Sequence, residues 1–86
     1  MDLDKLFTQS AENVTKLKTK PDDDALLKLY GLYKQATVGV CNTEQPSYYW
    51  DAKGYYKWEA WNNCKSKTKD VAKQEYINLV KSLMSK

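Results

Sequence analysis

Apolar residues recur at steps of three and four in four separate segments of the chain, which is the spacing of one face of an α-helix. The first segment places six residues on such a face: Leu3, Leu6, Phe7, Ser10, Val14 and Leu17. Pro21 ends this segment, because proline disfavours helical geometry at the residue before it, Lys20. The pattern therefore predicts an amphipathic helix that begins near Leu3 and ends before Pro21.

Three consecutive aspartates, Asp22 to Asp24, mark the start of a second predicted helix. Carboxylates at this position accept hydrogen bonds from the free amides of the first turn and complement the positive end of the helix dipole. We expect this helix to run to about Thr37, with Gly39 just beyond its end as a stop signal.

Residues 38–51 are rich in turn-forming residues and predict a long loop. A loop of this length in a small domain is more often functional or well packed than idle. A third helix is predicted from Asp51 to about Cys64. It carries Trp58 and Trp61 three residues apart, and indoles at helical spacing are more often part of a core than of a ligand site.

A fourth helix is predicted after Ser66 and Thr68, either of which offers a hydroxyl as the N-cap. Its apolar face follows steps of four, three and four residues: Ala72, Tyr76, Leu79 and Leu83. Together the four segments predict an all-α fold, a compact four-helix domain with one long loop between its second and third helices.

The composition agrees with this fold and removes several functions. With 86 residues the chain is expected to form a single domain over residues 1–86, and three glycines and two prolines argue against a turn-rich β fold. The chain has no histidine and no arginine, which removes imidazole chemistry, histidine metal sites and the bidentate arginine contacts of sequence-specific DNA binding. A net charge of +3 is too small to indicate a nucleic-acid partner, so we expect none.

Two further features concern the cellular setting. Cys41 and Cys64 lie far apart and form no CxxC pair, so we expect two reduced thiols and no metal. The first residues are acidic rather than basic and apolar, and the longest uncharged run, from Gln35 to Thr43, is too short to cross a bilayer. These features predict a cytoplasmic protein without a transmembrane segment.

One face of the second predicted helix combines three kinds of chemistry. Tyr30, Tyr33 and Lys34 stand at i, i+3 and i+4, and Leu26 and Leu27 lie one turn earlier. A ligand with an acyl tail, a flat base and a phosphate would meet complementary groups in that order. The alternative, which such a pattern fits more often, is a half-buried helix whose rings pack in the core while the lysine extends to solvent.

Other candidate functions have weaker support in the pattern. Lys57 stands with Tyr55 and Tyr56 beside Trp58, which is a weak signal for a phosphate site with base-stacking rings; the alternative is a surface lysine beside a core tryptophan. Catalysis is not expected, because the chain has no histidine base, no GxSxG elbow and no phosphate-binding GxxxxGK loop. A helical protein–protein interaction module is the alternative function, and its candidate surface is the consecutive aromatic run Tyr48 to Trp50.

The stretch YGLYKQATVG, residues 30–39, resembles the signature of the acyl-CoA-binding protein family. The resemblance continues through LKTKP at residues 17–21 and KWEAW at residues 57–61, and it ends at Tyr76 and Ile77. Asn42 and Pro46 also match, so the similarity covers nearly the whole chain in order. Against this pattern, Thr15 stands where the family often has a lysine close to the ligand.

The resemblance implies an antiparallel four-helix fold that binds medium- to long-chain fatty acyl-CoA esters and holds them as an intracellular pool for lipid metabolism. It implies that Tyr30 and Lys34 bind the ribose 3′-phosphate and adenine region, and that Lys57 adds a second ammonium group. Tyr33 and Tyr76 would line the same nucleotide site, while Leu26 and Leu27 would touch the acyl chain. A monomeric carrier follows, without cofactor, that serves acyl-CoA-using enzymes and makes at most transient contact with membrane surfaces.

Overall fold

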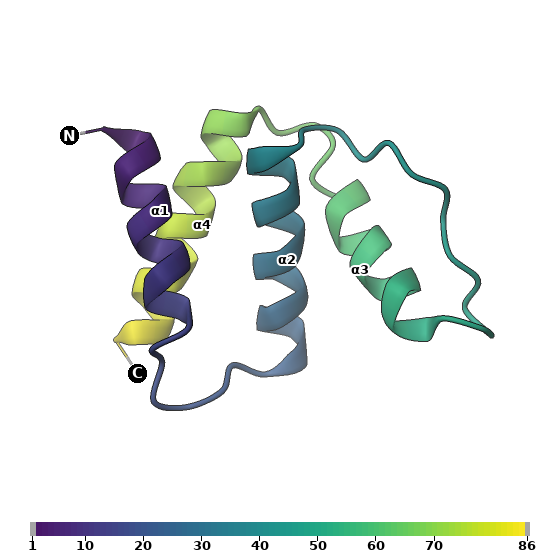
Figure 1. The fold of residues 1–86 in the computed structure, drawn as a ribbon, viewed down its shortest axis with the longest axis horizontal. Coiled ribbons are helices and arrows are strands. Elements are labelled where there is room, and N and C mark those ends of the chain that lie inside the picture. The colour runs from purple at the N-terminus through teal and green to yellow at the C-terminus, as the bar shows by residue number, and fades with distance from the viewer. Residues whose placement is uncertain (1, 86) are drawn as a thin grey trace.

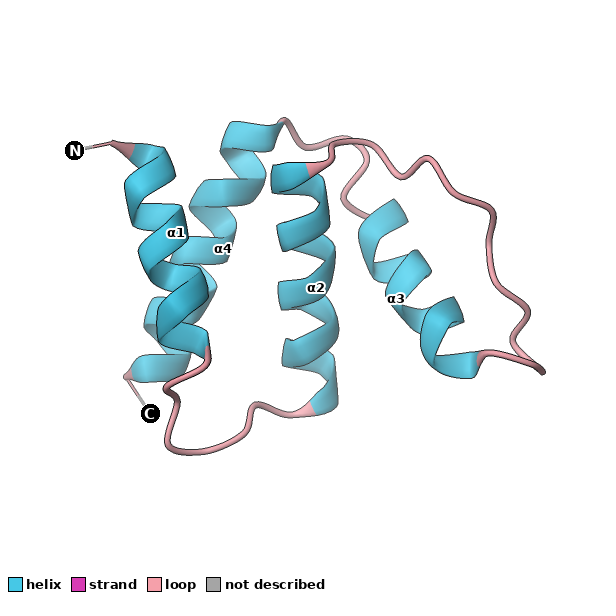
Figure 2. Ribbon diagram, in the orientation of Figure 1, coloured by secondary structure: helices cyan, strands magenta, loops and turns pink. Residues whose placement is uncertain are grey.

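The computed structural model describes residues 2–85, which form four helices and no strand. Helix α1 spans Leu3–Val14, α2 spans Asp23–Thr37, α3 spans Ala52–Asn62 and α4 spans Lys69–Met84. The predicted all-α four-helix architecture is therefore confirmed, including the long loop between α2 and α3 (Figures 1 and 2).

Two helix starts follow the predicted capping chemistry, and a third uses the same chemistry without having been predicted. The Asp22 carboxylate accepts a hydrogen bond from the Ala25 amide at 2.8 Å, and the Thr68 hydroxyl accepts one from the Val71 amide at 3.1 Å. Asp51 caps α3 in the same way through the amide of Gly54, at 3.0 Å. Each such cap contributes about 1 kcal/mol to the stability of its helix.

Two helix ends fall short of the positions that periodicity predicts. Helix α1 ends at Val14, so Leu17 lies beyond it, and α3 ends at Asn62 rather than near Cys64. At the end of α1 the Thr15 hydroxyl donates to the Glu12 carbonyl at 2.7 Å, a local side-chain bond that competes with continuation of the helix. Helix α2 ends as expected at Thr37, and Gly39 follows with a left-handed φ of 102°.

The helices pack in the spatial order α1, α4, α2, α3, so α1 and α3 lie at opposite sides of the molecule (Figure 1). Helices α1 and α4 run in one direction and α2 and α3 in the other, which gives two parallel pairs that are antiparallel to each other. Because α2 and α3 are parallel neighbours, the chain must return over about 22 Å, the length of a 15-residue helix, before α3 begins. This geometry accounts for the length of the loop at residues 38–51.

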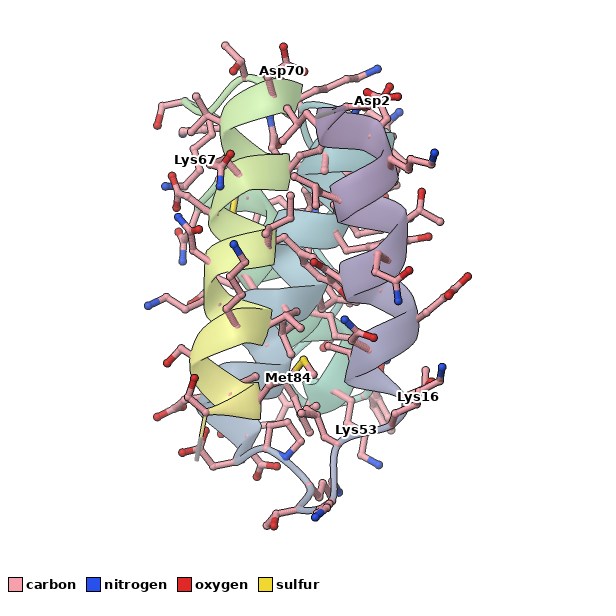
Figure 3. The ribbon with its side chains drawn as sticks, turned by 90° about the vertical axis from the view of Figure 1, so that its left-hand side faces the viewer. Asp2, Lys16, Lys53, Lys67, Asp70 and Met84 are labelled. Carbon is pink, nitrogen blue, oxygen red and sulfur yellow. The ribbon has the colours of Figure 1, made fainter. Side chains whose placement is uncertain are left out.

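The buried core lies among α1, α2 and α4 and is built from nine side chains: Phe7, Leu29, Leu32, Ala36, Cys64, Ala72, Tyr76, Ile77 and Val80. Viewed from the side of α1 and α4, polar side chains cover the outer faces of these helices (Figure 3). Helix α3 lies outside this core and is attached chiefly through α2.

Two indole groups fasten the long loop to α3. Trp61 is buried and donates from its indole nitrogen to the Gly39 carbonyl at 2.7 Å. Trp58 is half-buried and donates to the Thr43 carbonyl at 2.8 Å. The expectation that both indoles are structural thus fits Trp61 fully, whereas Trp58 anchors the loop from a partly exposed position.

Helices α2 and α3 make their closest approach at Gly31. A Cβ atom added at Gly31 would lie 2.7 Å from the carbonyl carbon of Ala60 and closer still to its oxygen. Real Cβ atoms essentially never approach backbone atoms this closely, so α3 can occupy its place only because residue 31 has no side chain.

The Gly31→Ala substitution provides a test with a definite sign. Alanine stabilises an exposed helix interior by about 1 kcal/mol relative to glycine. Here we expect Gly31→Ala to lower the free energy of unfolding, because forcing extra volume into a packed contact costs about 1–3 kcal/mol. Chemical denaturation followed by circular dichroism measures the change.

A matched pair at Lys28, an exposed position one turn earlier in α2, supplies the control. The difference between Lys28→Ala and Lys28→Gly reports the intrinsic preference of this helix for alanine. An increase in stability for Gly31→Ala that equals this difference would contradict the close approach of α2 and α3.

Candidate functional site

Helix α2 presents the predicted face of two tyrosines and a lysine. Tyr30 and Lys34 are half-buried and one turn apart, and Tyr33 is exposed over 42% of its surface. The α-helix fixes their common direction, because residues three and four apart are neighbours on its surface. The predicted combination of two phenol rings and an ammonium group is therefore present in the structure.

Helix α3 adds a second lysine and an indole to this face. The Lys57 ammonium lies 5.5 Å from the centre of the Tyr30 ring, and the Lys34 ammonium lies 4.9 Å from the centre of the Trp61 ring. Each lysine thus reaches across the α2–α3 contact to an aromatic ring on the other helix. Attraction between an ammonium group and the ring face holds both cations at the junction of the two helices.

The two cations are available to an anion. The ion pairs found within residues 2–85 are Lys67 with Glu75, at 2.9 Å, and Lys73 with Asp4. Neither pair involves Lys34 or Lys57, so no carboxylate in the described part of the chain neutralises them. Two unneutralised ammonium groups on one side of a helix pair suit a doubly charged phosphate better than a single carboxylate.

A cluster of three aromatic rings continues the site toward α1 and α4. Phe7 stacks on Tyr33 with 5.6 Å between ring centres, and it meets Tyr76 edge-on at 5.1 Å. Tyr33 and Tyr76 are 6.0 Å apart. Phe7 was predicted only as part of an apolar helix face, and its spacing in α1 does not reveal that it supports two site residues.

Burial tunes the phenol of Tyr76. The ring is almost fully buried, and loss of solvent raises its pKa above the ordinary tyrosine value, with a smaller contribution from Tyr33. A tyrosine is already protonated at neutral pH, and burial extends this to more alkaline pH, so the Tyr76 phenol can donate a hydrogen bond. An ionised oxygen, which would repel a phosphate, is disfavoured.

The two predicted acyl-chain residues diverge in the structure. Leu26 and Leu27 are both half-buried. Leu26 precedes Tyr30 by four residues and therefore lies on the tyrosine face of α2. Leu27 lines a cavity of about 580 Å³ among α2, α3 and α4, together with Leu32, Ala60 and Leu79. The helix thus directs Leu26 toward the tyrosine face and Leu27 toward the groove beside α3.

Helix α3 carries one more lysine that sequence reasoning did not single out. Lys53 is exposed and stands one helical turn before Lys57, so it extends the same side of α3. The i, i+4 spacing of Lys53 and Lys57 was available in the sequence as a signal.

Two other site types find no support within residues 2–85. No group of three or more metal-binding side chains is found there, and no helix there is long and apolar enough to cross a membrane.

A second cavity of about 470 Å³, between the α1–α2 loop and the end of α4, is lined by Leu17, Pro21 and Leu83 among others.

Several known proteins are similar in sequence to this chain over most of its length. A family model described as Acyl CoA binding protein matches residues 4–80. The chain is 51% identical to the acyl-CoA-binding protein of Saccharomyces cerevisiae over 81 residues, which cover 94% of this chain and 92% of that protein. It is 48% identical to the acyl-CoA-binding protein homolog of Drosophila melanogaster over 80 residues, or 93% of this chain and 92% of the homolog.

A solved structure agrees with the fold over nearly the whole chain. The crystal structure of Oryza sativa acyl-CoA-binding protein 2 superposes with a TM-score of 0.92 at 39% sequence identity. The match covers 98% of this chain and 92% of the rice chain. The similarity therefore includes all four helices and the loop that connects α2 to α3.

Proposed function

The chain belongs to the acyl-CoA-binding protein family, and on that premise we propose that it binds medium- to long-chain fatty acyl-CoA esters and carries them as an intracellular pool. The observation that carries the assignment to a site is the pair of unneutralised lysines, Lys34 and Lys57, held over aromatic rings at the α2–α3 junction. The ligand's 3′-phosphate is the group that such a pair fits.

Contacts to the head group of the ligand determine which ligand the site selects. A charge-assisted hydrogen bond from each lysine to the phosphate contributes about 1.5–3 kcal/mol. Adenine stacking on a tyrosine ring adds about 1–3 kcal/mol. Tyr30 and Tyr33 offer those rings beside the lysines, and the buried Tyr76 ring supports Tyr33. A fatty acid without the nucleotide forgoes all of these contacts.

The acyl tail supplies most of the affinity. Each buried methylene group contributes about 0.8 kcal/mol, so a sixteen-carbon tail offers roughly 10 kcal/mol before ordering costs. Leu26 and Leu27 present half-buried apolar surface one turn before the tyrosines, and we assign the start of the tail to them.

The remaining features of the proposal concern how the protein works in the cell. Residues 1–86 act as one acyl-CoA-binding domain, as a monomer in the cytoplasm, and the domain is a carrier rather than an enzyme. It needs no cofactor and no metal, because the ligand itself is the cargo. Acyl-CoA-using enzymes are the class of partner that receives this cargo, and contact with membrane surfaces is transient.

Calorimetric titration with palmitoyl-CoA, CoA and palmitate below their micellar concentrations tests the proposed function. We expect one palmitoyl-CoA to bind per chain tightly, and both fragments to bind much more weakly, because head and tail contribute to one composite site. Palmitate binding as tight as palmitoyl-CoA would instead mean a fatty-acid carrier in which the lysines are incidental. Absence of binding to all three would favour the protein–protein interaction module.

Substitution of the two lysines tests their assignment to the phosphate. We expect Lys34→Ala and Lys57→Ala each to weaken palmitoyl-CoA by about 10- to 150-fold, the equivalent of 1.5–3 kcal/mol. The same variants should bind 3′-dephospho-palmitoyl-CoA almost as well as the unaltered chain does. Competition binding with a fluorescent acyl-CoA measures both ligands.

Lys28→Ala is the matched control, since Lys28 is an exposed lysine on the same helix outside the tyrosine face. It removes the same charge and should change neither affinity appreciably. Equal losses for the two ligands in the Lys34 and Lys57 variants would show that these residues do not contact the 3′-phosphate.

A further inference from the structure

The two most exposed large hydrophobic side chains of residues 2–85 are neighbours. Tyr49 is 91% exposed and Trp50 is 92% exposed, in the turn that leads into α3. This end of the loop lies at the corner of the molecule farthest from α1 and α4 (Figure 1). We propose that Tyr49 and Trp50, here called the aromatic tip, dock the protein onto the headgroup region of an anionic phospholipid bilayer.

The aromatic tip projects from a built support. The Asp51 amide donates to the Ser47 carbonyl at 2.8 Å and closes a turn around residues 48–50. Tyr48 packs edge-on against Tyr55, with 5.4 Å between ring centres, and against Tyr56, at 5.9 Å. Because Tyr48 is held on α3, the turn keeps the next two rings directed away from the protein.

The chemistry of the aromatic tip suits the boundary between lipid and water. Tyrosine and tryptophan combine an apolar ring with a polar group, and both concentrate at membrane interfaces. Residues 45–50 carry no charge, so no ion has to be desolvated there. Asp51, the N-cap of α3, follows directly, and its exposed carboxylate accepts a hydrogen bond from the Gly54 amide.

One lysine, Lys53, lies close to the aromatic tip along the chain, two residues beyond the exposed Asp51 carboxylate. Lys53 is exposed on the first turn of α3, and Figure 3 places it toward the same end of the molecule as Lys16, away from Asp2 and Asp70. The chain as a whole carries a net charge of +3. The exposed Lys53 ammonium can therefore pair with the phosphate of an anionic lipid headgroup when the tip is embedded.

The size of the aromatic tip favours a bilayer over a protein partner. Each aromatic side chain buries about 150–250 Å² when covered, so two rings supply roughly 300–500 Å². A stable protein interface buries about 800 Å² on each partner. A convex tip with this small area is better suited to reversible insertion among headgroups than to a lasting protein contact.

Docking would also bring the proposed ligand site close to the lipid. Lys57 follows Asp51 by six residues along α3, a distance of about 9 Å at the helical rise. This consequence rests on the proposed function, whereas attachment of the aromatic tip itself does not require acyl-CoA.

Vesicle flotation without acyl-CoA tests the proposal on the full chain. Vesicles of phosphatidylcholine alone are compared with vesicles that contain roughly one third phosphatidylglycerol. We expect the chain to bind the anionic vesicles and the double variant Tyr49→Ser, Trp50→Ser to lose at least about tenfold in partitioning. Lys53→Gln should lose about fivefold on anionic vesicles and little on neutral ones.

The double variant Val40→Ser, Val71→Ser is the matched control. It removes two other exposed apolar side chains, 60% and 45% exposed, that lie outside the aromatic tip, and it should bind vesicles normally. Tryptophan emission adds a direct readout, because it should shift to shorter wavelength with anionic vesicles in the unaltered chain but not in Trp50→Phe.

Three results would overturn the proposal. They are failure of the unaltered chain to bind either vesicle, equal losses in the two double variants, and self-association in ultracentrifugation that disappears with the aromatic tip. Palmitoyl-CoA affinity measured without vesicles separates the two proposals. Binding to vesicles without binding to palmitoyl-CoA would refute the carrier function alone. Binding to palmitoyl-CoA without binding to vesicles would refute membrane docking by the aromatic tip alone.

Discussion

The contact between Gly31 and Ala60 is the constraint on which the candidate site depends. Helix α3 has no place in the main core, so its position relative to α2 is set by how closely the two backbones approach. That approach brings Lys57 over the Tyr30 ring and Lys34 over the Trp61 ring. A larger residue at position 31 would separate the helices and with them the two cations.

Phe7 and the long loop support the remaining parts of the candidate site. Phe7 of α1 packs against Tyr33 on α2 and Tyr76 on α4, so these two tyrosine rings of the candidate site rest on the core. The loop that returns the chain between the parallel helices α2 and α3 is fastened by the indoles of Trp58 and Trp61. The topology that places each lysine opposite an aromatic ring of the other helix therefore also creates the exposed aromatic tip.

Features set by local chemistry were predictable from the sequence, and features set by distant contacts were not. Asp22, Thr68 and Gly39 act within one turn of their own positions, and the structure confirms all three. The face of Tyr30, Tyr33 and Lys34 follows from helical spacing alone. Lys57 and Tyr76 joined the predicted site only through the family resemblance, because no spacing rule relates residues on different helices.

The same division explains what sequence reasoning missed. The roles of Gly31 and Phe7 arise from tertiary contacts, and the early end of α1 coincides with a threonine side-chain bond that periodicity does not register. The most direct measurement of the central claim is the set of intermolecular nuclear Overhauser effects in the palmitoyl-CoA complex. The account predicts contacts from the adenine protons to the rings of Tyr30, Tyr33 or Tyr76. Adenine contacts to Leu32 and Tyr56, in the groove beside α3, would contradict it.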